Sequence, residues 1–193
     1  MSFFDDTPER ARPRFDRPGG TDWTRPDGVI PGLARAGLFL IRTDEVAVAV
    51  SNALVYPNGF ELTVHARLHH EKFIWGKGPL DPDADTRTRQ APEQALRLGV
   101  LYADGRRART RTHRPIPVDD ANGEHLVIQE VGTGGTERQW DGQFWVHPLP
   151  PGGPVTFVAS WLLYEVDEAR AELDSSVIHE AAGQAVILWP DEP

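Results

Sequence analysis

The stretch that decides the fold is residues 46–68, which read VAVAVSNALVYPNGFELTVHARL. From Phe60 onward, apolar and polar side chains alternate strictly, and a period of two residues is typical of a strand with one buried and one solvent-facing side. Valine also recurs at every second position from Val46 to Val50. Between the two runs stands Asn58-Gly59, a pair that accepts the positive φ angles of a twist-matched hairpin turn. We therefore predict a β-hairpin that turns at Asn58-Gly59.

Short apolar runs separated by turn residues continue on both sides of this hairpin. They predict strands near residues 38–41, 96–102, 107–113, 126–128, 138–147 and 155–164, with a loop at 132–136. Tight turns are predicted at Thr43-Asp44 and at Asp104-Gly105. Many short strands at this spacing indicate a sandwich or a barrel. The sequence thus predicts a mainly β protein, an antiparallel Ig-like β-sandwich of about seven to nine strands.

The two ends of the chain differ from this body. Residues 1–36 combine five prolines and four glycines with balanced charge and no apolar period, which predicts a disordered or draped N-terminal arm. A single sandwich domain is expected over residues 37–193. Near its end, Asp174 or Ser175 can cap a helix, and apolar residues follow at helical spacing. One short C-terminal α-helix is predicted over about 175–189, with Trp189 packing across the sandwich.

Composition excludes several classes of site. The 193 residues include no cysteine, so disulfides, thiolate metal sites and cysteine nucleophiles are ruled out. No apolar run approaches the ~20 residues that span a bilayer, and the N-terminus lacks the basic and apolar regions of a secretory signal. We expect a cytoplasmic protein with no membrane partner and no cofactor.

Charge is unevenly distributed along the chain, whose net charge is −9. Residues 86–114 hold eight arginines against two acids, whereas residues 160–193 hold eight acids against Arg170. A strand with alternate arginines can bind phosphate or an acidic protein surface. The same arginines could instead pair with Glu165, Asp167 and Glu168 of their own molecule, or protect an edge strand from aggregation. The net negative charge argues against nucleic acid, and leaves an acidic protein partner or self-association.

Trp145 is the second feature that points to a partner. Its neighbours Phe144 and Val146 must face away from it on a strand, so its indole lies either under the helix or on an exposed patch. An exposed aromatic patch would mark an interface. The residues predicted to bind a partner are therefore Arg106, Arg107, Arg109, Arg111 and Trp145.

No catalytic or metal motif is complete. Asp81, Asp83 and Asp85 resemble the opening of a calcium loop, but Thr86 and Pro92 stand where that loop needs glycine and glutamate. His65 and His69 share one strand face about 13 Å apart, too far for one ion. His70 and Glu71 lie next to them without the spacing of a zinc site, and exposed, neutral histidines are the favoured interpretation. Four serines lack the Gly-x-Ser-x-Gly elbow, namely Ser51, Ser160, Ser175 and Ser176. No catalytic residue and no metal ligand is predicted.

Three segments carry a resemblance. They are Leu98–Arg106, Arg138–Pro151 with its Trp140-Asp141 and Phe144-Trp145-Val146, and Val155–Trp161. In these segments, in its Met-Ser-Phe-Phe opening and in the Ala-rich run before Leu188-Trp189-Pro190, the chain resembles a family of uncharacterised actinobacterial single-domain proteins. The resemblance implies a β-sandwich and carries over no activity, cofactor or catalytic residue.

Three functions follow as hypotheses. The first is a non-catalytic binding or assembly module that acts through a charged face of the sandwich, with residues 70–94 as a long loop beside it. The second is a hydrolase-like or isomerase-like enzyme that uses a His/Asp pair from residues 65–85, and it requires His69 or His70 to meet a carboxylate in a pocket. The third is a sandwich that binds a sugar or another small ligand through Trp75 and Trp145, and it requires an exposed aromatic platform.

Overall fold

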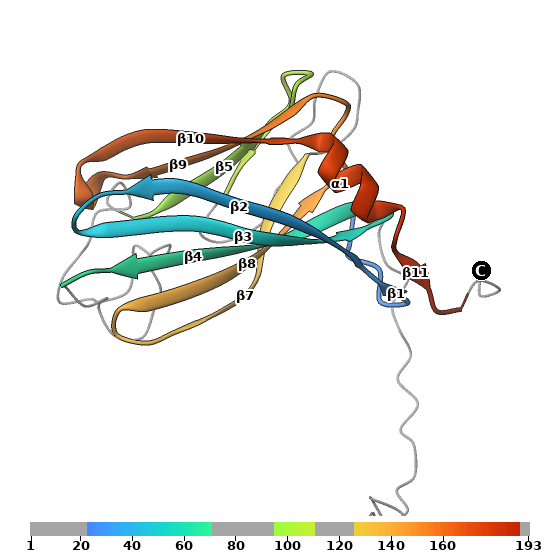
Figure 1. Ribbon diagram of the computed structural model, residues 1–193, viewed down its shortest axis with the longest axis horizontal. Coiled ribbons are helices and arrows are strands. Elements are labelled where there is room, and N and C mark those ends of the chain that lie inside the picture. The colour runs from blue at the N-terminus through green and yellow to red at the C-terminus, as the bar shows by residue number, and fades with distance from the viewer. Residues whose placement is uncertain (1–22, 71–94, 111–125, 190–193) are drawn as a thin grey trace, which may run out of the picture.

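The computed structural model describes residues 23–70, 95–110 and 126–189. Within these ranges the protein is mainly β, with two antiparallel sheets, a two-stranded ribbon and one α-helix (Figure 1). Eleven strands are described, more than the seven to nine that the sequence predicts. No helix among the described residues is long and apolar enough to cross a membrane.

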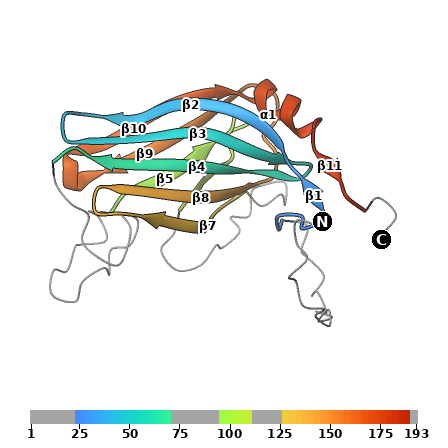
Figure 2. The same cartoon turned by 60° about the horizontal axis from the view of Figure 1, so that its bottom comes forward.

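The larger sheet has five strands in the order β2-β3-β4-β8-β7, and each neighbouring pair is antiparallel (Figure 2). Its strands are β2 (Gly32–Arg42), β3 (Val46–Tyr56), β4 (Gly59–Leu68), β7 (Val127–Gly135) and β8 (Gln139–His147). The predicted hairpin forms its centre, because β3 pairs with β4 from Val46↔Leu68 to Tyr56↔Gly59. The predicted hairpin is therefore confirmed, and its two strands lie in the middle of this sheet.

The smaller sheet has four strands in the order β10-β9-β5-β6. They are β5 (Arg97–Leu101), β6 (Arg107–Arg109), β9 (Pro154–Trp161) and β10 (Val166–Asp174), with a 3-10 turn η2 (Leu162–Tyr164) between the last two. The helix α1 (Ser175–Ala182) packs against β2, β3 and β10. The ribbon joins β1 (Val29–Ile30) to β11 (Val186–Ile187) near the chain ends (Figure 1).

The core lies between the two sheets and follows from the period-two pattern. Phe60, Val64 and Ala66 of β4 are almost completely buried, whereas the alternate residues Thr63 and His65 are not. The core also takes Val48 and Val50 from β3, Phe144 and Val146 from β8, and Val155, Phe157 and Ala159 from β9. One face of each sheet therefore packs into the core, and the polar face of the five-stranded sheet points outward.

The hairpin turn differs from the predicted turn. Tyr56 pairs with Gly59, so the two turn residues are Pro57 and Asn58, and neither Asn58 nor Gly59 has positive φ. Pro57 holds φ near −65° and is incompatible with the mirror-image turn that Asn-Gly would favour. Glycine is needed at position 59 for a different reason. A Cβ there would lie 2.5 Å from the Val146 carbonyl oxygen and 2.7 Å from the Trp145 ring.

Several predicted boundaries also differ. Strand β2 begins at Gly32, inside the segment that was expected to be an arm, and residues 1–22 lie outside the described residues. The expected loop at 132–136 is wrong, because Gly132 to Gly135 pair with β8 through their backbones. Backbone pairing needs no side chain, and so a glycine-rich run can continue a strand when its partner strand is already in place.

The C-terminal helix is shorter than predicted. Asp174 caps it as expected, its carboxylate accepting from the Ser176 N–H at 2.8 Å. The helix ends at Ala182, because Gly183 forms the C-cap and the following chain leaves to pair with β1. Trp189 is 52% exposed and packs beside Gly28, so its predicted position across the sandwich is wrong.

Candidate functional site

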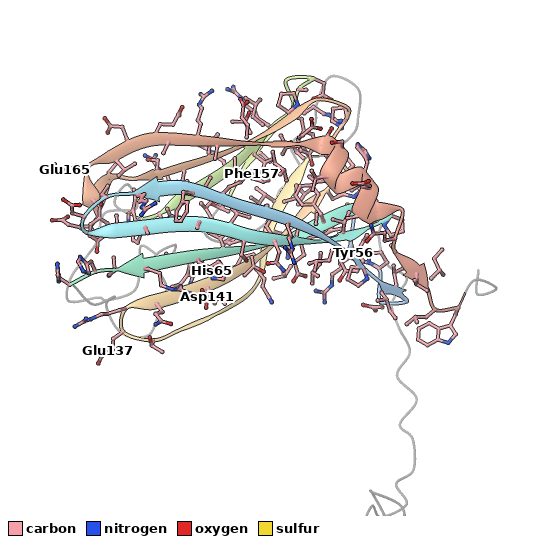
Figure 3. The ribbon with its side chains drawn as sticks, viewed as in Figure 1. Tyr56, His65, Glu137, Asp141, Phe157 and Glu165 are labelled. Carbon is pink, nitrogen blue, oxygen red and sulfur yellow. The ribbon has the colours of Figure 1, made fainter. Side chains whose placement is uncertain are left out.

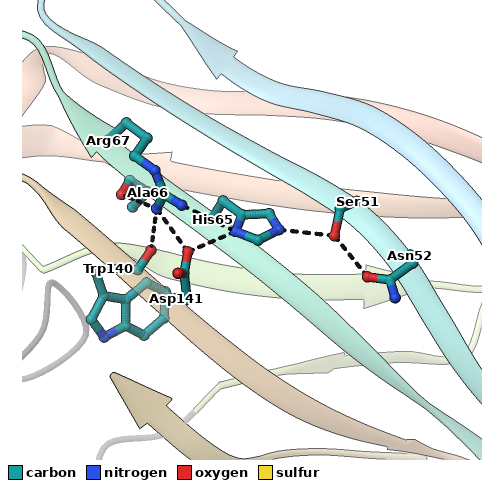
Figure 4. A network of polar contacts seen from close by, with 7 residues as sticks. All are labelled: Ser51, Asn52, His65, Ala66, Arg67, Trp140 and Asp141. Atoms are coloured by element: carbon teal, nitrogen blue, oxygen red, sulfur yellow. Dashed lines mark hydrogen bonds and ion pairs between the residues drawn. The ribbon is translucent and has the colours of Figure 1, made fainter. Parts of the chain in front are cut away.

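Three polar residues from three neighbouring strands meet on the outer face of the five-stranded sheet. Ser51 comes from β3, His65 from β4 and Asp141 from β8. His65 Nε2 lies 2.8 Å from Ser51 Oγ, and His65 Nδ1 lies 2.6 Å from Asp141 Oδ1 (Figure 4). Figure 3 places His65 and Asp141 on the side of the sheet away from the other sheet. A hydroxyl, an imidazole and a carboxylate are thus joined in one line of contacts.

Strand register explains how residues so far apart in the sequence come together. His65 is paired with Asp141 between β4 and β8, and directly opposite residues project to the same face of a sheet. Strand β3 has one extra residue between the pairs Val50↔Val64 and Ala53↔Leu62. This bulge keeps Ala53 in the core while Ser51 remains exposed on the outer face.

Arg67 holds the carboxylate end of the line. Its Nη1 lies 2.7 Å from Asp141 Oδ1 and also donates to the carbonyl oxygens of Ala66 and Trp140, each at 2.9 Å (Figure 4). Partial burial acts to raise the pKa of Asp141, but hydrogen bonds from Arg67 and His65, together with their charges, outweigh it and lower that pKa. Because an ordinary aspartate has a pKa of about 3.9, Asp141 is ionised at neutral pH.

The proton positions in this line depend on the neighbouring residue Asn52. Ser51 Oγ donates to Asn52 Oδ1 at 2.7 Å, and in this arrangement it accepts from His65 Nε2. If the Asn52 amide turns over, its NH2 group donates to Ser51 instead. Ser51 is then free to donate to His65. In the first arrangement Ser51 accepts from His65 Nε2, and in the second His65 Nε2 can accept a proton from Ser51.

The same face carries an aromatic and a further cation. Phe39 of β2 is paired with Ala49, which is paired with His65, and Arg42 is in line with Ala47 and Arg67. Phe39 is 57% exposed, and the Arg42 guanidinium carbon lies 5.1 Å from the centroid of its ring. Phe39, Arg42, Ser51, His65, Arg67 and Asp141 together are called the open face below.

The predicted arginine strand is only partly present among the described residues. Arg107 and Arg109 are exposed on β6, and Arg111 lies outside the described residues. Arg106 belongs to the preceding turn, where its Nε donates to Asp104 Oδ2 at 2.7 Å and its guanidinium lies 5.5 Å from the Tyr102 ring centroid. Arg106 is therefore engaged within its own turn, and Arg107 and Arg109 are the accessible members of the set in the part of the chain that the structure describes.

Among the described residues, Arg107 and Arg109 are separated from the acidic stretch of the same molecule. Strands β6 and β10 are the opposite edges of the four-stranded sheet, with β5 and β9 between them. Three strand spacings place the backbones of β6 and β10 about 14 Å apart, which is too far for their side chains to form a close ion pair. Glu168 instead pairs with Arg170 of its own strand. The position of Arg107 and Arg109 on an edge strand agrees with the alternative that they discourage edge-to-edge aggregation.

Trp145 is not on an exposed patch. It is 2% exposed, and residues 23–25 cover it, with its indole Nε1 donating to the Trp23 carbonyl at 2.7 Å. The aromatic platform needed for sugar binding therefore does not include Trp145, and Trp75 lies outside the described residues.

The histidines expected in an enzyme lie at the end of β4. His69 Nδ1 is 3.0 Å from the Asp44 carbonyl, and the His69 ring stacks on His70 with centroids 3.7 Å apart. Glu71, Asp81, Asp83 and Asp85 lie outside the described residues. In the part of the chain that the structure describes, no group of three or more His, Asp or Glu side chains could hold a metal ion.

Sequence reasoning identified His65 as a polar-face residue but missed Ser51 and Asp141 as its partners. The alternating pattern could have placed Ser51 and His65 on one face of the hairpin, whereas nothing local to Asp141 indicated that β8 would lie beside β4. Comparison with protein-family models, with curated proteins and with solved structures finds no match to this chain.

Proposed function

We propose that this protein is a non-catalytic binding module, with an Ig-like sandwich as its frame and the open face as its contact surface. The observation that supports this function best is the connected network of Ser51, His65, Arg67 and Asp141 on three hydrogen-bonded strands. Side chains already held by their neighbours lose little conformational freedom on binding. An exposed Phe39 beside them adds the kind of aromatic contact that dominates interface energies.

The charge of the open face favours an acidic protein segment as the partner. Within the open face, the two arginines Arg42 and Arg67 outnumber the single carboxylate, Asp141. The face is thus locally cationic on a chain whose net charge is −9. Local complementarity of charge sets partner choice and association rate even when the overall charge has the opposite effect.

A synthetic acidic peptide tests this function. A fluorescein-labelled peptide of alternating Glu and Asp is titrated with the full chain, and its Gln/Asn counterpart serves as the neutral probe. We expect the acidic peptide to bind more tightly than the neutral one, with an affinity that falls as salt is added. The double variant F39A/R42E should weaken this binding at least about tenfold, because it removes the exposed ring and reverses a charge.

The double variant R107E/R109E is the matched control, because it reverses two exposed arginines on the other sheet. It should bind the acidic peptide within about threefold of wild type once its altered net charge is allowed for. Loss of binding in R107E/R109E but not in F39A/R42E would overturn the open face in favour of the arginine strand. Equal binding of both peptides, or self-association of the wild-type chain in place of peptide binding, would also overturn the proposal.

Ester hydrolysis is a second candidate function, favoured by the specific order Ser51–His65–Asp141. In the arrangement where Ser51 donates to His65, Ser51 Oγ attacks an ester carbonyl carbon and its proton moves to His65 Nε2. The departing alkoxide takes that proton and leaves as the alcohol. Water then attacks the acyl carbon on Ser51 and gives a proton to His65 Nε2, and His65 returns that proton to Ser51 Oγ as the C–Oγ bond breaks and the carboxylic acid departs. Asp141 holds Nδ1 of the ring throughout.

A fluorophosphonate probe distinguishes this second function from binding alone. Such a probe forms a covalent bond with an activated serine and loses fluoride, so mass spectrometry of the digested protein reports labelling of Ser51 directly. We expect labelling of wild type to exceed that of S51A and of H65A, with Ser160, a serine on the other sheet, unlabelled in all three. Wild-type labelling no greater than that of S51A would remove the hydrolytic function and leave the binding function standing.

A further inference from the structure

Residues 23–25 lie across one end of the outer face of the five-stranded sheet, and are called the strap below. Three side chains contact three consecutive strap residues. Trp145 Nε1 donates to the Trp23 carbonyl at 2.7 Å, and Asn58 Nδ2 donates to the Thr24 carbonyl at 2.9 Å. Arg25 Nη1 donates to Glu61 Oε2. The sheet thus contacts the strap in the way that a binding site contacts a peptide.

Glu61 is the unusual member of this set, because it is a carboxylate that is only 4% exposed. A buried carboxylate is costly unless a cation or hydrogen-bond donors accompany it. Its partner Arg25 comes from the strap and not from the sheet, and the Arg25 side chain is 46% exposed. The hydrogen bond to Glu61 raises the pKa of Arg25 in spite of the opposing effect of partial burial. The guanidinium therefore reaches in from solvent to a carboxylate buried in the sheet.

The other two contacts recognise backbone. Every residue presents a carbonyl, so Trp145 and Asn58 recognise two successive main-chain carbonyls and not particular side chains. The Trp145 indole is held by the edge of the Tyr56 ring, with centroids 5.6 Å apart and planes at 76°. Two backbone contacts followed by one arginine contact define a short pattern, any residue, any residue, arginine.

We propose that Asn58, Glu61 and Trp145 form a recognition site for a short peptide segment of this pattern, which the strap of the same chain occupies. An arginine-bearing segment of another protein binds the same site when the strap leaves it. The strap remains attached through the ribbon, where Leu188 N–H donates to the Gly28 carbonyl at 2.9 Å. A short tether gives the strap an effective concentration in the millimolar range, so an outside peptide binds wild type only weakly.

Weakening the strap in the full chain tests this proposal. The variant R25A removes the strap's hold on Glu61, and the probe is a labelled, N-acetylated peptide with the sequence of residues 21–27, TDWTRPD. We expect fluorescence anisotropy to show this peptide binding R25A at least about tenfold more tightly than wild type, because the cis competitor is weakened. The same peptide with alanine in place of arginine should lose that binding. The double variant R25A/E61Q should likewise lose the binding of the arginine peptide, because the carboxylate that the arginine contacts is gone.

R35A is the matched control, since Arg35 is an exposed arginine of β2 on the same sheet. It should bind the peptide as weakly as wild type does. Equal peptide binding by R25A and wild type, or equal binding of the arginine and alanine peptides to R25A, would overturn the proposal. Circular dichroism verifies folding. If R25A does not fold, R25K replaces it, because lysine retains the charge but lacks the planar guanidinium, and peptide binding stronger than that of wild type is again required.

Discussion

Phe144→Ala is expected to lower the free energy of unfolding by about 3 to 5 kcal/mol, the usual cost of deleting a fully buried phenylalanine. Phe144 is completely buried on β8 and faces the core next to Trp140, with ring centroids 6.2 Å apart. Strands on both sides are hydrogen-bonded in a continuous sheet, so they cannot collapse freely into the space left behind. The loss is a large part of the 5–15 kcal/mol that stabilises most proteins.

Urea denaturation followed by tryptophan fluorescence measures this loss, and the midpoint of thermal unfolding should fall by roughly 10 °C or more. Phe39→Ala is the control, because it removes the same ring from a position that is 57% exposed. We expect it to change stability by less than about 1 kcal/mol. Similar losses in the two variants would contradict the assignment of Phe144 to the core and of Phe39 to the open face.

Gly32→Ala is expected to destabilise the protein by about 2 to 3 kcal/mol through overpacking. A Cβ at position 32 would lie 1.8 Å from the carbonyl oxygen of Ala181 and 2.7 Å from its carbonyl carbon. Both are backbone atoms at the end of α1, and the same oxygen accepts the Gln184 N–H at 3.0 Å. The clash therefore cannot be relieved by turning a side chain, and the end of α1 must move away from β2.

Urea denaturation again gives the size of the effect, and hydrogen exchange should show faster exchange of the α1 amides in the variant. Gly134→Ala is the matched control, because a Cβ there meets nothing within 4 Å. It should change stability by less than about 0.5 kcal/mol. If Gly32→Ala were as stable as Gly134→Ala, the close contact between β2 and α1 would be refuted.

Local patterns predicted much of the fold, because each of them reports a property of one strand. The alternation from Phe60 to Leu68 correctly predicts which side chains enter the core. Asp104-Gly105 correctly predicts a tight turn, since Gly105 has a φ of 90°. Strand β10, with its charged residues from Asp167 to Asp174, was not predicted. It has almost no buried apolar residue, and it becomes a strand because its backbone pairs with the edge of β9.

The candidate site was largely beyond prediction for a related reason. Ser51 and His65 belong to one hairpin, but Asp141 is 76 residues from His65, and only the register between β4 and β8 brings the two together. The bulge that returns Ala53 to the core after Ser51 has no sequence signal of its own. The cover over Trp145 likewise comes from residues 23–25, more than a hundred positions earlier in the chain.

By itself, the sequence determined the β character of this protein, the hairpin at residues 46–68 and the division of the hairpin's strands into a buried and an outward face. These properties depend on side-chain alternation along one strand. The apolar face of such a strand is buried and the polar face stays in solvent, whichever strands become its neighbours. The tertiary structure alone decided which strands are neighbours and in what register. Those choices depend on long-range backbone pairing, and they bring His65 to Asp141, separate β6 from β10 and lay the strap over Glu61.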